Sequence, residues 1–152
     1  MQSLFYVSGF LYSLKTNQIL LLQSYQEGED CLCSILGGDS IDEEESVAAF
    51  QRIINKSLDI NLKAKDIYPV YDYFHKTRNK LNYVFYAEVK STKKFNDLER
   101  GRPSWLPFSE PLKLSFTPQT KQDVIVGERV INAKLRDIAA KELQEQEQNV
   151  PG

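Results

Sequence analysis

Hydrophobic and polar positions alternate along this chain with two periods, and the shorter period predicts β-strands. Two apolar runs rich in strand formers, 4–14 and 19–25, flank a short polar connector and predict a β-hairpin. A third run, 31–36, predicts a short strand that ends at a Gly-Gly pair. The runs 65–75 and 81–90 predict a second hairpin across a polar turn, and the alternation in its second strand places four side chains on one face: Tyr83, Phe85, Ala87 and Val89.

The longer period predicts two helices. Apolar residues spaced by three or four positions form a single stripe over residues 45–58 (Val47, Phe50, Ile54 and Leu58). A similar but broader pattern extends from about 119 to 146, and its last turns are polar, so we expect them to fray or to project from the body. Residues 91–103 are expected to form a polar loop, and two prolines make 109–118 a connector.

The order of these elements indicates a mixed α+β domain, in which helices flank a mixed β-sheet. At 152 residues the chain has the length of one domain. We expect a single domain over 1–152, with its core at about 4–140 and a polar tail at 141–152.

Composition excludes several classes of protein. With 19 Lys and Arg against 21 Asp and Glu, the net charge of −2 disfavours a general nucleic-acid binder. No apolar run reaches the length of a membrane-spanning helix, and the N-terminus lacks the pattern of a secretory leader, so we expect a cytoplasmic protein. Two cysteines and one histidine exclude a disulfide scaffold and disfavour a zinc site.

The charge is nevertheless segregated along the chain. Residues 27–45 carry eight acidic residues and no base, whereas 76–102 carry eight bases against three acids. The basic segment is either a solvated loop or a rim that attracts a phosphate-bearing ligand. The second hairpin is rich in aromatic residues, of which one or two are candidates for stacking on a base, and His75 at its turn is a weak candidate for a general base.

One motif lies between the predicted strand 31–36 and the first helix. Gly38 is followed after five residues by Glu44 and, after seven more, by Arg52, while Ile54 and Ile60 add two bulky aliphatic positions. This spacing resembles the box of the Nudix hydrolases, and the order of the elements resembles that family over most of residues 4–140. We expect the Gly37-Gly38 pair to turn the chain sharply between strand and helix.

The resemblance implies cleavage of a diphosphate by water, with Mg²⁺ or Mn²⁺ held by three glutamates of the box helix. Here Ile53, Lys56 and Ser57 occupy these positions, so the charge where the ions would bind changes from −3 to +1. A hard cation needs oxygen ligands, and unlike Glu, Ile53 offers none. We therefore expect that metal-dependent hydrolysis is lost. The protein is then a binder of a nucleoside-diphosphate type ligand, with Gly38, Arg52 and Lys56 as candidate binding residues, or of a protein partner.

Two alternatives stay open. The first is an active hydrolase with a rewired metal site, in which Glu43, Glu44 and Glu45 are the candidate ligands and Glu44 or Glu110 is the candidate catalytic carboxylate. The second is an interaction module in which the long closing helix, about 119–146, is the surface for a homodimer or for another protein partner. In the simplest interpretation Arg52 forms an ion pair with Glu44 or Glu45, and both members of that pair then have a structural role.

Overall fold

The computed structural model describes residues 4–24, 32–109 and 115–148. Its strands are β1 (Phe5–Ser13), β2 (Gln18–Ser24), β3 (Leu32–Ser34), β4 (Leu36–Asp39), β5 (Ile67–His75), β6 (Lys80–Val89), β7 (Arg102–Pro107) and β8 (Ser115–Phe116). Its helices are α1 (Ser46–Leu58), a short 3-10 helix η1 (Ala64–Asp66) and α2 (Pro118–Gln148).

The strands form one mixed sheet with β1 near its centre. The path through the sheet is β5-β6-β1-β2-β3-β8, with β4 paired to β1 and β7 paired to β2. β1 runs parallel to β6 along its whole length, whereas β4 pairs antiparallel with its first half and β2 pairs with its last two residues. Both predicted hairpins are therefore present, although the first is paired only next to its turn.

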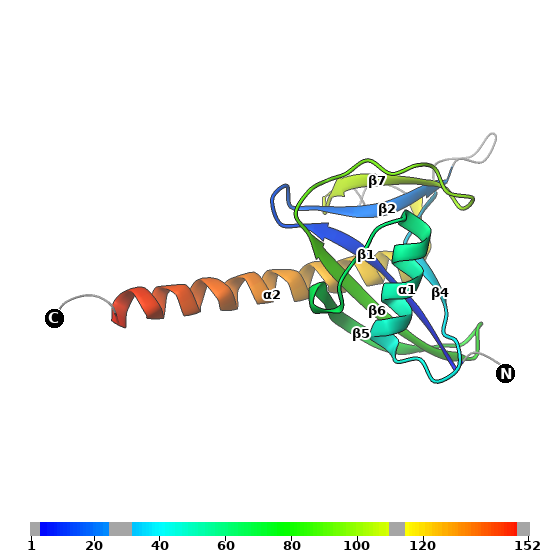
Figure 1. The fold of residues 1–152 in the computed structure, drawn as a ribbon, viewed down its shortest axis with the longest axis horizontal. Helices are drawn as coiled ribbons and strands as arrows, with labels where there is room; N and C mark the ends of the chain where they lie inside the picture. Colours follow the sequence, from blue (N-terminus) through cyan, green and yellow to red (C-terminus); the bar gives the residue numbers. More distant parts are fainter. Residues whose placement is uncertain (1–3, 25–31, 110–114, 149–152) are drawn as a thin grey trace.

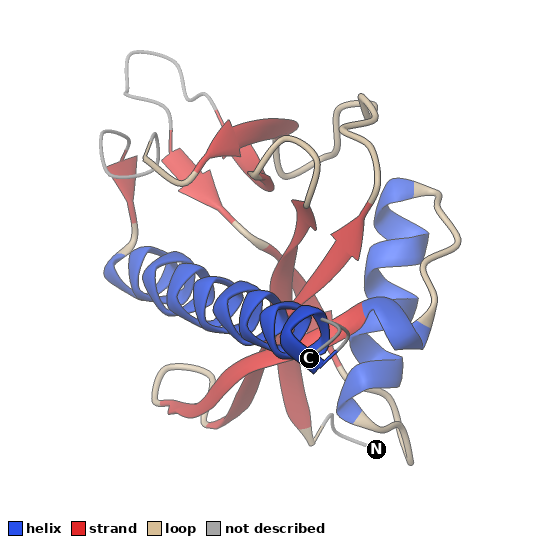
Figure 2. Ribbon diagram, turned by 90° about the vertical axis from the view of Figure 1, so that its left-hand side faces the viewer, coloured by secondary structure: helices blue, strands red, loops and turns tan. Residues whose placement is uncertain are grey.

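The two helices cover opposite faces of this sheet (Figures 1 and 2). The stripe predicted over 45–58 faces the sheet: Phe50, Ile54 and Leu58 are buried in one apolar cluster with Val7 and Leu11 of β1. Phe85 and Ala87 of β6 join the same cluster, which confirms the face predicted from the alternation. The mixed sheet between helices therefore follows the sequence prediction.

The other face packs against α2. Phe10 and Tyr12 alternate with Val7 and Leu11 along β1, and they lie in a second cluster with Val124 and Ile131 of α2. Only the first part of α2 is buried in this way, and the helix then extends away from the sheet (Figure 1). The polar last turns, which we predicted to fray or to project from the body, are helical up to Gln148.

The Gly-Gly pair contradicts the sequence prediction. Gly37 and Gly38 do not end a strand or turn the chain toward the helix, because both lie within β4 and pair with Ser8 and Val7 of β1. Their missing side chains instead make room for neighbours. A Cβ at Gly37 would lie 2.7 Å from the Val7 carbonyl oxygen, and a Cβ at Gly38 would lie 2.9 Å from Cδ1 of Ile53. Close approach on both faces of β4, rather than backbone freedom, requires the pair.

Three boundaries also differ from the prediction. The run 31–36 contains all of β3 and the first residue of β4. β7 begins at Arg102, inside the expected loop. Pro118, predicted to lie in a connector, opens α2, where a residue without a backbone N–H is tolerated because that donor has no partner in a first helical turn. Among the described helices, none is long and apolar enough to cross a membrane.

Candidate functional site

Glu44 and Arg52 of the motif form a two-pronged ion pair. Arg52 donates from Nε to Glu44 Oε2 at 2.7 Å and from Nη2 to Oε1 at 3.0 Å. Nη2 also donates to the backbone oxygen of Asp39 at 2.9 Å, and Glu44 Oε1 accepts the Ile41 N–H. The hydrogen bonds from Arg52 hold the pKa of Glu44 below its usual range, and the same contact raises the pKa of Arg52. The pair ties the loop before α1 to the middle of that helix.

The three positions where the motif would supply metal ligands do not fit a divalent cation. Ile53 is 8% exposed and packs into the core beside Gly38, where it presents only carbon atoms. Lys56 is exposed on α1, and its ammonium group would repel a cation. Ser57 is half-buried and contributes at best one neutral oxygen. Mg²⁺ or Mn²⁺ therefore has no anionic ligand from these three residues.

The acidic residues before α1 do not together form a site that could replace the three missing carboxylate ligands of the motif. Both oxygens of Glu44 are engaged by Arg52, while Glu43 and Glu45 are exposed and Glu45 makes no capping hydrogen bond. Within the described ranges, no three His, Cys, Asp or Glu side chains are grouped so as to hold a metal ion. Glu110 lies outside the described residues, so its predicted role is untested.

A pocket of about 250 Å³ lies on the other face of the sheet, between β1, the β5–β6 hairpin and the first turns of α2. Among the residues that line it are Tyr6, Ser8, Tyr73, His75, Arg78, Asn82, Arg100, Gln119 and Asp123. In β4, Gly37 contacts Tyr6, which lines this pocket, and the adjacent Gly38 contacts Ile53 of α1. The pocket is thus next to the motif, although it opens on the opposite face.

The interior wall of this pocket is polar. Asp123 is 3% exposed, and its Oδ1 accepts hydrogen bonds from the Tyr71 hydroxyl at 2.5 Å and from Gln119 Nε2 at 3.0 Å. Burial raises the pKa of Asp123, and these two hydrogen bonds partly offset that shift. Across the pocket, Asn82 is 1% exposed and donates to Ser8 Oγ at 3.0 Å. The wall therefore offers carboxylate, amide and hydroxyl groups in fixed positions.

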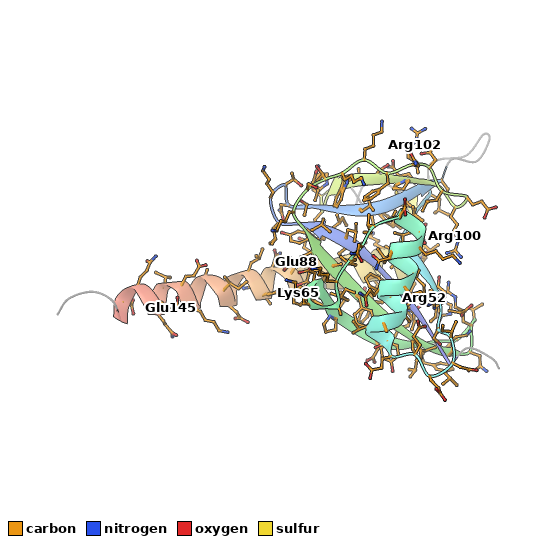
Figure 3. The ribbon with its side chains drawn as sticks, in the orientation of Figure 1. Arg52, Lys65, Glu88, Arg100, Arg102 and Glu145 are labelled. Atoms are coloured by element: carbon orange, nitrogen blue, oxygen red, sulfur yellow. The ribbon has the colours of Figure 1, made fainter. Side chains whose placement is uncertain are left out.

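Cations and aromatic rings line the mouth of the pocket. The Arg78 guanidinium lies 3.8 Å from the centre of the Tyr6 ring, and its Nη1 donates to Asn82 Oδ1. Arg100 Nη1 donates to the Gly37 carbonyl oxygen at 3.4 Å, and Figure 3 shows Arg100 at the end of the molecule away from the projecting part of α2. Two bases of the segment 76–102 thus meet at one site. The Nδ1 atom of His75 accepts the Arg78 backbone N–H, so this nitrogen is not available as a base.

Sequence reasoning found part of this pocket and missed the rest. The basic segment contributed Arg78 and Arg100, and the aromatic hairpin contributed Tyr73. Asn82, Gln119 and Asp123 were not predicted. An amide inside the apolar strand 81–90 was a usable signal for Asn82, because a buried polar side chain needs a partner. No local signal marks Gln119 and Asp123, which resemble ordinary polar residues at the start of a helix.

No protein-family model matches the sequence, and no curated protein matches it either. Solved structures do match. A Nudix-family hydrolase from Clostridium perfringens superposes with a TM-score of 0.63 at 14% identity, covering 84% of this chain and 96% of that one. The Nudix domain of Shewanella oneidensis NrtR, in complex with ADP-ribose, gives 0.63 at 14% identity and covers 86% and 90%. The Escherichia coli ORF135 protein gives 0.64 at 16% identity and covers 88% and 94%. The chain thus has the Nudix fold, as its motif predicted.

Proposed function

We propose that this protein binds a nucleotide derivative in the pocket between the sheet and the start of α2, without cleaving it by the metal-dependent route. The observation that carries the proposal is the pocket itself: a buried carboxylate and a buried amide inside, with two arginines and two tyrosines around them. These groups match the parts of a nucleotide, which has a planar base with hydrogen-bonding edges and an anionic phosphate. ADP-ribose bound to the Shewanella domain of the same fold supports this class of ligand.

Each part of the ligand has a partner of suitable chemistry. Tyr73 presents an aromatic ring on which a planar base can stack, which contributes about 1–3 kcal/mol for a base on an aromatic side chain, whereas the Tyr6 ring is covered by Arg78. Asp123 supplies an acceptor for the edge of the base, while Asn82, whose amide is hydrogen-bonded to Ser8 and Arg78, holds Arg78 in place. Arg78 and Arg100 supply charge for the phosphates, because guanidinium groups pair with phosphate oxygens in two-pronged geometry.

The second half of the proposal follows from the motif. Replacing three carboxylates by Ile53, Lys56 and Ser57 changes the local charge from −3 to +1. A single pair of unit charges 4 Å apart interacts by about 4 kcal/mol at an effective dielectric of 20, so this change is large enough to prevent tight binding of Mg²⁺. The alternative of a rewired hydrolase needs other ligands, and Glu44 is already committed to Arg52.

A thermal-shift screen of nucleotides tests the binding half. Mono- and diphosphates of the common nucleosides and ADP-ribose are added to the protein in buffer with EDTA. A ligand at a hundredfold excess over its Kd stabilises the native state by about 2.7 kcal/mol, which raises Tm by several degrees. We expect at least one compound to raise Tm for the wild type.

Two variants locate the effect. Arg78→Ala removes a pocket arginine, whereas Arg129→Ala removes an exposed arginine of α2 that does not line the pocket. We expect the Tm increase to be lost in Arg78→Ala and kept in Arg129→Ala. If no compound stabilises the wild type, or if both variants respond as the wild type does, the binding proposal is wrong. Chromatography of the same compounds after incubation with Mg²⁺ tests the second half, which hydrolysis would overturn.

A further inference from the structure

The last part of α2 extends from the body without a partner among the described residues. Every residue from Arg136 to Glu147 is exposed, a length of about 18 Å at 1.5 Å per residue (Figure 1). Isolated helices of this length are marginal in water, because helix formation needs either a long chain or tertiary packing. Ile138 is 43% exposed and Leu143 is 59% exposed, so the projecting segment carries apolar surface as well. A packing partner would stabilise it.

The tip of this helix is acidic. Its last seven residues, 142–148, contain three glutamates and no basic residue: Glu142, Glu145 and Glu147. Figure 3 shows Glu145 far from the sheet. None of the three glutamates forms a salt bridge with any residue that the structure describes. The helix macrodipole places further negative charge at this end, so the tip favours a basic partner.

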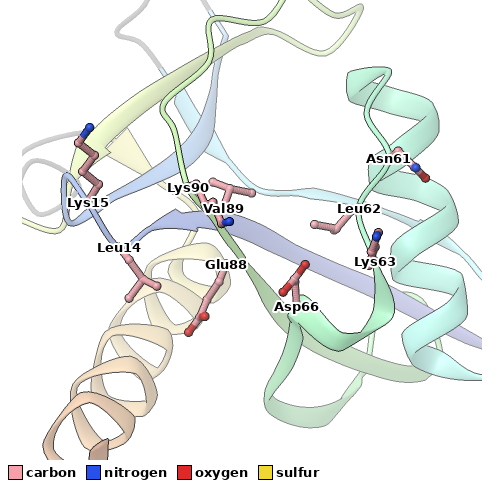
Figure 4. Close-up of a pocket in the computed structure, with 9 residues that line it drawn as sticks. All are labelled: Leu14, Lys15, Asn61, Leu62, Lys63, Asp66, Glu88, Val89 and Lys90. Carbon is pink, nitrogen blue, oxygen red and sulfur yellow. The ribbon is translucent and has the colours of Figure 1, made fainter. Parts of the chain in front are cut away.

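A basic cavity of about 690 Å³ lies where α2 leaves the body. It is lined by Leu14 and Lys15 of the β1–β2 turn, by Asn61, Leu62, Lys63 and Asp66 after α1, and by Glu88, Val89 and Lys90 at the end of β6 (Figure 4). Leu14 is 49% exposed and, with Leu62 and Val89, provides apolar surface. Figure 4 shows Leu14 and Glu88 next to α2.

The charge of this cavity is positive. Lys15, Lys63 and Lys90 are exposed, and none of them forms a salt bridge within the described part of the chain. Of its two carboxylates, Glu88 is already paired with Lys134 of α2 at 2.9 Å. Three unpaired lysines therefore surround an apolar floor, beside the projecting helix.

We infer that the acidic tip of α2 in one copy of this chain docks on the lysine-lined cavity of a second copy, forming a two-fold dimer. The β1–β2 turn, which carries part of the cavity lining, lies on the side of the body from which α2 projects (Figure 1), so two copies related by a two-fold axis can place their helices antiparallel. Each tip then reaches the other body beside the exit of its helix. This arrangement forms the same contact twice and closes on itself, as in most homodimers.

The antiparallel arrangement also places opposite charges next to each other along the helix. Arg136 is exposed where α2 leaves the body, whereas Glu142, Glu145 and Glu147 lie at its end. Antiparallel helices bring the end of one next to the start of the other's projection. The exposed Leu143 then approaches the apolar floor of the cavity, so apolar burial adds to the charge pairing.

Two charge-reversal variants test this inference. The tip variant is Glu142→Lys, Glu145→Lys and Glu147→Lys, and the cavity variant is Lys15→Glu, Lys63→Glu and Lys90→Glu. All six side chains are exposed, so neither variant removes core packing. We expect wild-type protein to sediment as a dimer in sedimentation velocity, and each variant alone to dimerise at least about tenfold more weakly, because like charges then face each other.

An equal mixture of the two variants is the decisive sample. In a heterodimer of these two variants, the basic tip of one meets the acidic cavity of the other, and the acidic tip of the second meets the basic cavity of the first. We expect the mixture to form a dimer with wild-type strength. A matched control, Lys76→Glu, Lys94→Glu and Lys121→Glu, reverses three exposed lysines that do not line this cavity and should dimerise like the wild type.

The contrary outcomes are equally specific. A wild type that is monomeric at every concentration overturns the inference and leaves the tip for another protein. A dimer that neither reversal weakens, or a mixture that does not associate, also overturns it, since the contact then lies elsewhere. Because nucleotide binding plays no part in these measurements, their failure does not affect the proposed function.

Discussion

The ion pair between Arg52 and Glu44 gives a quantitative prediction about the role of the motif. Replacing Arg52 with Met removes two hydrogen bonds to Glu44 and one to the Asp39 carbonyl oxygen. The Glu44 side chain is 10% exposed and would then keep only the Ile41 N–H as a donor. Hydrogen bonds to charged groups contribute about 1.5–3 kcal/mol when desolvated, but Arg52 is 36% exposed, which reduces this value.

We therefore expect Arg52→Met to destabilise the protein by about 2 kcal/mol, which lowers Tm by about 4–8 °C for a chain of this size. In a double-mutant cycle with Glu44→Gln, the coupling free energy should be about 1 kcal/mol at pH 7. The assay is urea unfolding, followed by circular dichroism, of the wild type, both single variants and the double variant.

The pH dependence of this coupling supplies a second readout. Because Arg52 lowers the pKa of Glu44 below its ordinary value of 4.5, the coupling is fully present above pH 4.5. It is lost as the pH falls through the lower pKa of the folded protein. The exposed pair Arg102–Asp97, with an N–O distance of 3.3 Å, serves as a matched control in which we expect no measurable coupling. Additive effects of the two substitutions at pH 7 would refute a structural role for Glu44.

Two further substitutions test the packing of β4 and the buried carboxylate. Gly38→Ala should destabilise the protein by about 1–3 kcal/mol in urea unfolding, because its Cβ would lie 2.9 Å from Ile53 Cδ1. Ile53→Val removes that carbon atom and should therefore recover part of the lost stability. An equal loss with Ile53 and with Val at position 53 would contradict this packing. Burial raises the pKa of Asp123 above its ordinary value of 3.8. The protonated carboxyl therefore stabilises the folded state fully below pH 3.8, and this stabilisation is lost as the pH rises through the pKa of the folded protein. The side chain of Asp123→Asn cannot ionise. When the free energy of unfolding is measured from pH 3 to 7, we therefore expect that of the variant to increase relative to that of the wild type as the pH rises. The opposite trend would contradict a pKa of Asp123 raised by burial.

The sequence predicted the framework of this protein because that framework depends on local pattern. The spacing of Phe50, Ile54 and Leu58 predicts a helix with one buried face, and the structure confirms it. The alternation in β6 likewise fixed which residues face α1. The spacing of Gly38, Glu44 and Arg52 resembles the Nudix box, and this resemblance predicted the fold.

The Gly-Gly pair shows where local pattern is insufficient. Two adjacent glycines are the usual signal for a turn, and the chain was expected to turn there. What requires them is the close approach of the Tyr6 side chain on one face and of Ile53 on the other, which depends on how β1 and α1 pack against β4. The residues next to the pair in the sequence do not carry this information. The sequence alone therefore marked Gly37 and Gly38 as structurally important but predicted a turn instead of close packing.

The pocket was only partly predictable for a similar reason. Tyr6, Asn82 and Asp123 come from β1, β6 and α2, and they meet because β6 runs parallel to β1 while α2 crosses their common face. Charge segregation pointed to Arg78 and Arg100, because a basic segment is visible without a structure. The buried carboxylate and amide have no such regional signal.

Phosphorus NMR of a nucleoside diphosphate mixed with the protein in Mg²⁺ tests at once whether the protein binds the diphosphate and whether it cleaves it, since one spectrum reports both. We predict that the diphosphate resonances shift or broaden when the protein is added, and that no phosphomonoester resonance appears over time. Growth of a phosphomonoester resonance would show that the Ile53, Lys56 and Ser57 positions do not prevent hydrolysis. Unchanged diphosphate resonances for every nucleoside tested would contradict the proposed binding.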